Sequence, residues 1–199
     1  MGKSNRDLEF LFEMGRLRLL QRTWQRFFMT KVANDVEHTF RVMWLALIIA
    51  KKEKVGNEEK IMKMALVHDV TESRTGDVDY LSRLYSERKE ELAIHDMFEG
   101  VALEGEFIEL WKEFEKRETI EAKIVKDADN LDIDMELMEQ WASNRDLVMA
   151  KFNARKKIIP SKLFTKTAKK MFKEIYTSGV HNWHLNSKNN RFQSGDWKK

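Results

Sequence analysis

The pattern of apolar and polar positions predicts helices along most of the chain. An apolar period close to that of a helix runs through the N-terminal residues and breaks near Gly15. Asn34 and Glu37 have the spacing of a capping box, in which two side chains satisfy backbone N–H groups at a helix start. The apolar residues that follow predict a buried helix ending near Lys52, and Asn57 is placed to cap the next helix.

The second half of the chain continues this helical pattern after one interruption. The segment from Ser73 to Asp77 breaks the apolar period and is interpreted as a loop. Pro160 and Ser161 mark the predicted start of the last helix, because proline is tolerated in a first helical turn. The further helices are predicted over Tyr80–Val101, Phe107–Lys116, Ile120–Ala142, Asp146–Lys156 and Lys162–Tyr176.

The composition agrees with a single all-α domain. The 199 residues are enough for one compact body with a sizeable core and too few for two ordinary domains. Only 8 glycines and 1 proline are present, so turn-rich β architectures lack the residues that punctuate them. We therefore predict one helical domain over residues 1–185, followed by a loosely attached basic tail over residues 186–199.

Hydropathy and charge narrow the classes of function. The longest apolar run, Val42–Ala50, falls far short of the roughly 20 residues that span a bilayer, so no membrane association is expected. Cysteine is absent, which excludes disulfides and thiolate metal sites and fits a cytoplasmic protein. The 36 basic and 33 acidic residues are interleaved, and this balance is too mild to indicate nucleic acid. The basic stretch Lys151–Lys173 is interpreted as a solvated helix face.

Two histidines and two aspartates form the main candidate site. His38 and His68 lie at similar distances from the turn between two predicted antiparallel helices, so their side chains can meet. Asp69 adjoins His68, and Asp129 lies on an inward apolar stripe, where an unpaired carboxylate is costly. Such nitrogen and oxygen donors suit Mn²⁺, Fe²⁺, Co²⁺ or Zn²⁺ better than Ca²⁺. The alternative is that both histidines are ordinary hydrogen-bonded residues and that Asp129 pairs with Lys126.

Four short motifs carry a resemblance to a known family. They are Val36-Glu37-His38, His68-Asp69-Val70-Thr71-Glu72, Thr75-Gly76-Asp77 and Lys126-Asp127-Ala128-Asp129. In this order and spacing they resemble the HD-domain metal-dependent phosphohydrolases, and among these the 5′-deoxynucleotidase-like branch. The similarity runs from about Leu17 to about Trp141. It implies a helical HD-domain fold, a divalent transition metal held by His38, His68, Asp69 and Asp129, and a homodimer.

The resemblance also assigns two acidic residues to the chemistry. It implies that Glu72 serves the proton transfers and that Asp77 contacts the sugar or helps to position the attacking water. Glu72 lies one helical turn beyond His68, so its carboxylate can lie beside a metal rather than on it. From the residues alone, Glu72 could instead be a solvated residue at a helix end, and Asp77 an ordinary turn residue.

A phosphate substrate needs cations, because a divalent ion and two aspartates roughly cancel in charge. In the resembling branch an arginine and a tryptophan before the first histidine motif line the substrate pocket, and they correspond to Arg22 and Trp24. The interval between these two residues departs from that branch, so Arg26 is a rival to Arg22. Trp24 could stack on a base or pack in the core. The cations near the motifs are Arg22, Arg26, Arg41, Arg74 and Lys126.

These features together predict hydrolysis of a small nucleotide, with removal of the 5′-phosphate of a deoxynucleoside monophosphate as the main hypothesis. The nearest rival is a deoxynucleoside triphosphate hydrolase on the same fold. A rival of another class is a noncatalytic nucleic-acid-binding protein that stacks bases on Trp183, Phe192 and Trp197. We do not expect nucleic acid as the partner, because that function leaves the inward histidines and aspartates unexplained. His181 and His184 are expected to pack or to face solvent rather than to form a second metal site.

Overall fold

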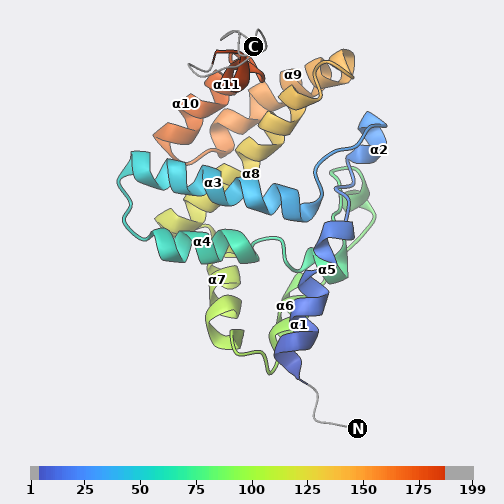
Figure 1. Ribbon diagram of the computed structural model, residues 1–199, viewed down its shortest axis with the longest axis vertical. Helices are drawn as coiled ribbons and strands as arrows, with labels where there is room; N and C mark the ends of the chain where they lie inside the picture. The colour runs from blue at the N-terminus through green and yellow to red at the C-terminus, as the bar shows by residue number, and fades with distance from the viewer. Residues whose placement is uncertain (1–4, 187–199) are drawn as a thin grey trace, which may run out of the picture.

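The computed structural model describes residues 5–186, and the regular secondary structure in that range is helical (Figure 1). Paired extended backbone in this range is limited to one bridge between Gln21 and Asn34. The prediction of a single all-α domain is confirmed, whereas residues 187–199 of the predicted tail, with Phe192 and Trp197, lie outside the described residues. None of the described helices is long and apolar enough to cross a membrane. The helices are α1 (Arg6–Met14), η1 (Leu17–Leu19), α2 (Gln25–Phe28), α3 (Asp35–Glu53), α4 (Glu58–Val67), α5 (Glu72–Thr75), η2 (Ser82–Leu84), α6 (Glu90–Phe98), α7 (Glu104–Lys116), α8 (Ile120–Glu139), α9 (Arg145–Lys162), α10 (Lys166–Ile175) and α11 (Asn182–Leu185).

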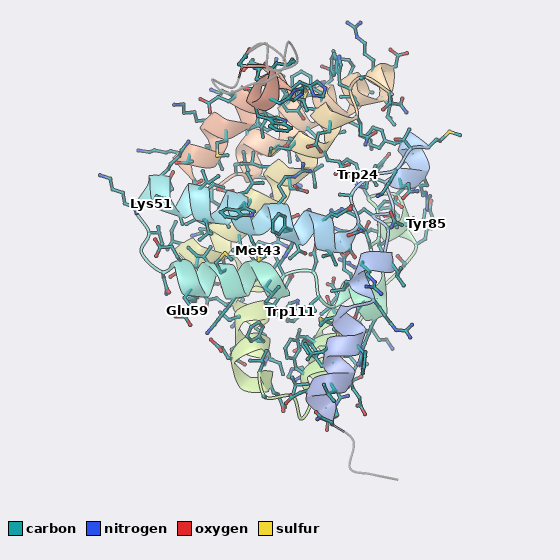
Figure 2. The ribbon with its side chains drawn as sticks, viewed as in Figure 1. Trp24, Met43, Lys51, Glu59, Tyr85 and Trp111 are labelled. Atoms are coloured by element: carbon teal, nitrogen blue, oxygen red, sulfur yellow. The ribbon has the colours of Figure 1, made fainter. Side chains whose placement is uncertain are left out.

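Helix α3 runs through the middle of the molecule and packs against both α4 and α8 (Figure 1). Val42 and Ile49 of α3 are fully buried in one apolar cluster with Ile124 and Leu131 of α8. Burying a side chain of this size contributes roughly 1.5–3 kcal/mol. Figure 2 shows charged side chains such as Lys51 pointing away from the bundle. This core fixes the relative positions of the helices that carry the site.

The start of α3 is set by the predicted capping box. The Asn34 side chain accepts a hydrogen bond from the backbone N–H of Glu37 at 2.9 Å, and the backbone N–H of Asn34 donates to the Glu37 carboxylate at 3.0 Å. These bonds satisfy two backbone donors and place His38 in the first, buried turn. Asn57 occupies the N-cap position of α4 as predicted, but its side chain makes no capping hydrogen bond and instead donates to Glu121 at 3.5 Å.

The continuous helix predicted over Tyr80–Val101 is wrong. The chain there forms the short helix η2, an irregular stretch, and then α6. The Asp79 carboxylate accepts hydrogen bonds from the backbone N–H groups of Leu81 and Ser82, at 2.9 and 3.1 Å. Such a local side-chain bond competes with helix formation. The apolar residues of the stretch, including Leu84, remain exposed, so packing does not favour a helix either.

The helix break predicted at Pro160 is also wrong. Helix α9 continues through Pro160 and ends at Lys162, so the proline lies in its last turn and leaves one carbonyl a turn earlier without its helical hydrogen bond. The start of α10 is instead capped by Thr165, whose hydroxyl accepts a backbone hydrogen bond from the first turn of the helix at 3.1 Å. Asp127 of α8 holds the same segment, because its carboxylate accepts hydrogen bonds from the backbone N–H groups of Phe164 and Thr165, each at 2.8 Å. A local cap and a contact with a distant helix therefore set this boundary together.

Candidate metal centre

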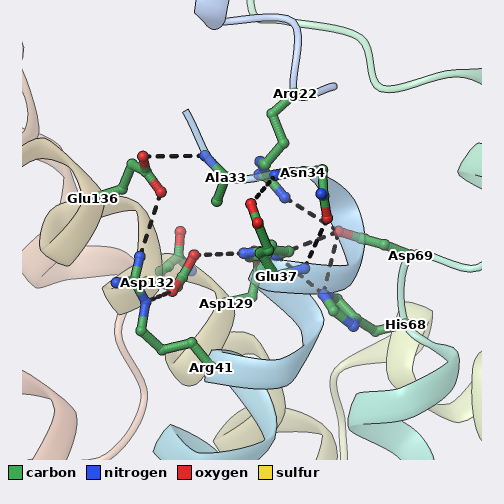
Figure 3. A network of polar contacts seen from close by, with 12 residues as sticks. Arg22, Ala33, Asn34, Glu37, Arg41, His68, Asp69, Asp129, Asp132 and Glu136 are labelled. Atoms are coloured by element: carbon green, nitrogen blue, oxygen red, sulfur yellow. Dashed lines mark hydrogen bonds and ion pairs between the residues drawn. The ribbon is translucent and has the colours of Figure 1, made fainter. Parts of the chain in front are cut away.

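Two histidines and two aspartates converge at the junction of α3, α4 and α8 (Figure 3). His38 comes from the first turn of α3, His68 and Asp69 follow the end of α4, and Asp129 lies in the middle of α8. One ligand atom from each lies within 4.8 Å of those of the other three. The Nε2 atoms of His38 and His68 are 3.3 Å apart, and both side chains are almost completely buried. The structure thus brings together the four residues that the sequence singles out.

The outer nitrogen of each imidazole is already engaged. His38 Nδ1 lies 2.6 Å from a carboxylate oxygen of Asp132, and His68 Nδ1 lies 2.8 Å from the carbonyl oxygen of Ala65. Both partners are acceptors, so each ring carries a hydrogen on Nδ1. When a ring is neutral, its Nε2 atom therefore directs a lone pair toward the other histidine. Two lone pairs 3.3 Å apart repel each other unless a proton or a metal cation lies between them. This arrangement, with two carboxylates beside it, fits a divalent transition metal.

Asp129 uses its two oxygens for different partners. Lys126 donates to Oδ2 at 2.6 Å, while Oδ1 lies 3.4 Å from Nε2 of His38. The pairing with Lys126 considered from the sequence is therefore present, and it leaves the other oxygen facing the cluster. Burial opposes ionisation of this carboxyl, but the charge of Lys126 holds the pKa of Asp129 well below its usual value. Asp129 is accordingly an anion at neutral pH.

In the metal-free protein, His38 holds its proton more tightly than an imidazole in water does. Burial and the positive charge of Arg22 both disfavour an imidazolium. Hydrogen bonds to three aspartates, with Asp129 first, nevertheless keep the pKa of His38 well above its usual value. A cation that binds the cluster must therefore displace a proton from His38.

Arg22 is the cation that lies deepest beside this cluster. Its Nη1 atom lies 3.7 Å from Oδ2 of Asp69, and this buried nitrogen has no hydrogen-bond partner within residues 5–186. Trp24, two residues on, packs edge-on against Phe28 with ring centroids 5.4 Å apart. Its buried Nε1 atom also has no partner in the described chain. Arg22 is thus placed to meet a ligand, and Trp24 is largely a packing residue.

Glu72 is buried rather than solvated at a helix end. Its Oε1 atom accepts a hydrogen bond from Arg88 at 2.9 Å, and its buried Oε2 atom has no partner in the described residues. Burial, followed by the negative charges of Asp69 and Asp77, raises the pKa of Glu72 to about 9. Glu72 therefore keeps its proton at neutral pH in the metal-free protein.

Asp77 fixes the segment that carries Arg22. One of its carboxylate oxygens accepts hydrogen bonds from the backbone N–H and the hydroxyl of Thr23, at 2.5 and 2.9 Å. Gly76, just before it, has a φ of 75°, a conformation that a residue with a side chain rarely adopts. Asp77 is therefore more than an isolated turn residue, because it connects the loop after α5 to Thr23, which lies between Arg22 and Trp24.

The remaining candidate cations are paired with carboxylates outside the cluster. Arg26 is half-exposed and lies 3.4 Å from Asp79. Arg74 binds Glu13 at 2.7 Å. Arg41 donates to Asp132, Glu136 and Glu139.

The exposed His181 and His184 face solvent, as expected from the sequence.

Three residues that support the site were not predicted from the sequence. Asp132 holds His38, Arg88 holds Glu72, and Thr23 holds Asp77. The position of Asp132, three residues after Asp129 on one helix, was a usable signal, because residues at this spacing share a helix face. Arg88 and Thr23 lie in irregular segments, where no periodic pattern indicates a partner.

Comparison with known proteins agrees with this geometry. Residues 14–171 match the HD domain family. The 5′-deoxynucleotidase HDDC2 of Dictyostelium discoideum is 33% identical over 144 residues, which cover 66% of this chain and 76% of that protein. The human protein of the same name is 30% identical over 138 residues, or 66% of this chain and 67% of that protein.

Solved structures share the fold. A conserved hypothetical protein from Pyrococcus furiosus matches with a TM-score of 0.65 and 23% identity, over 86% of this chain and 99% of that chain. A predicted metal-dependent phosphohydrolase from Magnetospirillum magnetotacticum matches with a TM-score of 0.64 and 20% identity, over 86% of this chain and 92% of that chain. Given the family match over most of its length and its buried histidine and aspartate cluster, the chain belongs to the HD-domain phosphohydrolases.

Proposed function

We propose that this protein hydrolyses deoxynucleoside 5′-monophosphates to deoxynucleosides and inorganic phosphate, using a bound Mn²⁺, Co²⁺, Fe²⁺ or Zn²⁺ ion. The observation that carries the proposal is the buried cluster with Arg22 beside it, whose Nη1 lacks a hydrogen-bond partner in residues 5–186. A guanidinium N–H in this position suits a phosphate oxygen. The names of the relatives support the same substrate class.

The residues divide the work in this proposal. A divalent ion held by His38, His68, Asp69 and Asp129 would polarise a phosphoryl oxygen and orient the attacking water. Arg22 binds the phosphate and offsets its negative charge. Glu72 serves the proton transfers, giving a proton to the departing 5′-oxygen and taking one from the attacking water. Arg88 keeps the Glu72 side chain in place through Oε1, which leaves Oε2 for the proton transfers.

The supply of cations favours a monophosphate over a triphosphate. Arg26, Arg41 and Arg74 are each paired with carboxylates outside the cluster. Arg22 and Lys126 are the two candidate cations that contact cluster residues. A monophosphate dianion needs about that much positive charge beyond the metal, whereas a triphosphate carries about four negative charges. The proposal therefore places the deoxynucleoside triphosphate hydrolase second.

Recognition of the sugar belongs to Asp77 in this proposal. Its bonds to Thr23 place it next to the Arg22 segment, where the 5′-linked sugar would follow the phosphate. The homodimer that the resemblance implies stays a prediction, which sedimentation velocity tests. The cytoplasmic location, which the absence of cysteine fits, also stays a prediction and is tested by cell fractionation.

A substrate panel tests the proposal. Purified protein is incubated with Mn²⁺ and with nucleoside mono-, di- and triphosphates, and the products are separated by ion-exchange chromatography. We expect inorganic phosphate from deoxynucleoside monophosphates, loss of activity in His68→Ala, and retained activity in His184→Ala, which removes an exposed histidine. Release of tripolyphosphate from a triphosphate, with monophosphates left intact, would transfer the function to the rival.

A further inference from the structure

An apolar cavity of about 420 Å³ opens beside the candidate metal centre. Its walls come from α1, α3, α4 and the segments around α6 and α7, and include Phe10, Met43 and Phe107. Two acidic side chains, Asp35 and Asp69, also line it. Because Asp69 belongs to the four-residue cluster, the cavity and the cluster share a wall. A cavity of this size and lining is typical of small-molecule binding sites.

Asp35 is the unusual part of this wall. The residue is 2% exposed, and neither carboxylate oxygen has a hydrogen-bond partner within residues 5–186. Burial raises the pKa of Asp35 to about 7, although the positive charge of Arg22 opposes this rise. The start of α3 offsets part of the cost of the charge, but the carboxylate keeps its capacity to accept hydrogen bonds. Buried polar groups without partners call for an explanation, and a ligand with N–H donors provides one.

We propose that this cavity is the nucleobase subsite and that Asp35 accepts N–H groups from the edge of the base, an inference that rests on the proposed function. A nucleobase has two apolar faces that fit the lining and a polar edge that fits the carboxylate. Guanine presents two adjacent N–H groups on one edge, which match the two oxygens of a carboxylate. Thymine has one N–H between two carbonyl oxygens, and those oxygens would face the negative charge of Asp35. The subsite therefore prefers guanine to thymine.

The position of the cavity suits a substrate whose phosphate lies at the metal centre. The backbone N–H of Asp35 donates to the carbonyl of Leu20 at 3.3 Å, so Asp35 lies beside the segment that leads to Arg22. Asp69 lies near Arg22 and also lines the cavity, so this proposal places the phosphate at Arg22 and the base in the cavity. The motifs that carry the family resemblance assign no role to Asp35. The residue lies between the capping Asn34 and the first histidine motif and belongs to neither.

Binding of deoxyguanosine, which has no phosphate, tests the subsite apart from catalysis. Calorimetry on the full chain is expected to show deoxyguanosine binding more tightly than thymidine. Asp35→Asn should weaken deoxyguanosine binding by about 10-fold to 100-fold, because the amide offers one acceptor and turns an NH₂ toward a donor. Leu103→Trp, which adds bulk to the lining of the cavity, should abolish binding. Glu59→Gln, an exposed carboxylate in the first turn of α4, is the matched control and should change nothing.

Several results would overturn the subsite. The first is that wild type and Asp35→Asn bind deoxyguanosine equally well. The second is that the wild type binds neither nucleoside. The third is that the protein sediments as a dimer and that Leu103→Trp dissociates this dimer without changing nucleoside binding, which would make the cavity an interface between copies. Manganese affinity is measured on each variant and should stay at the wild-type value, which shows that the fold is intact. Phosphate release from dGMP is scored separately, so a protein that binds deoxyguanosine through Asp35 without hydrolysing dGMP retains the subsite and fails the proposed function.

Discussion

Replacing Asp132 with asparagine should move the ring hydrogen of His38 to the nitrogen that faces the metal site. Arg41 donates from Nε to one oxygen of Asp132, and His38 Nδ1 lies 2.6 Å from the other. In Asp132→Asn one oxygen remains, and Arg41, which has only donors, retains it. The amide NH₂ then faces His38 Nδ1 and requires an acceptor there. The ring hydrogen consequently moves to Nε2, the atom that faces the cluster, where it blocks a cation.

The size of this effect follows from how metal sites depend on such partners. Loss of an outer partner of a metal-binding histidine costs roughly 10-fold to 100-fold in metal affinity. That ratio corresponds to about 1.4–2.7 kcal/mol of binding free energy. The free energy of unfolding of the metal-free variant should also fall by about 1.5–3 kcal/mol, because a buried hydrogen bond to a charged group is lost.

Asp134→Asn provides the matched control. Asp134 lies on the same helix, is fully buried, and binds Arg155 and Tyr176, with no recorded contact to His38 among the described residues. This variant should lose stability and keep its Mn²⁺ affinity. Calorimetric titration with Mn²⁺ measures the affinities, and nitrogen NMR of the histidine rings identifies the tautomer. Wild-type Mn²⁺ affinity in Asp132→Asn, or a hydrogen still on Nδ1, would refute this account of His38.

Three further predictions concern the chemistry of the site. Glu72→Gln should keep its bound metal, but its kcat should fall roughly 100-fold to 10,000-fold in steady-state kinetics. Glu90→Gln, which removes the other carboxylate that pairs with Arg88, should keep most of the activity. Arg22→Lys should raise KM by about 10-fold to 100-fold, whereas Arg26→Lys should not, and the reverse order would make Arg26 the phosphate ligand. Mn²⁺ binding should release about one proton from His38, so the Mn²⁺ affinity should fall as the pH falls below the raised pKa of His38. Calorimetry in buffers of different ionisation enthalpy measures the released proton, and binding heats that do not change between these buffers would contradict this prediction.

The parts of the fold that depend on neighbours in sequence were predictable. The capping box of Asn34 and Glu37 fixes the start of α3 through bonds that span three residues. The meeting of His38 and His68 follows from the regular rise of two helices joined by a short turn. Both predictions need only local geometry, and the structure shows both features.

The parts that depend on distant contacts were not predictable. Pro160 was expected to begin a helix, yet α9 continues through it, and the segment before α10 is held by Asp127, which lies more than thirty residues earlier in the chain, in addition to the local cap. The orientation of Arg41 could not be read from its nearness to His38, and the side chain supports Asp132 instead of facing a substrate. Arg88 reaches Glu72 from an irregular segment that no apolar period describes. Long-range charge pairing has no signature in a single sequence.

The central claim is that a metal bound at the four-residue cluster makes this chain a phosphohydrolase of deoxynucleoside monophosphates. The most direct measurement titrates Mn²⁺ into metal-free protein while bound Mn²⁺ and phosphate release from dGMP are followed in the same samples. The account predicts that the rate rises in proportion to bound metal, and that Asp129→Ala loses both. Full phosphate release by the chelated protein, or saturating Mn²⁺ at the cluster without any hydrolysis, would contradict it.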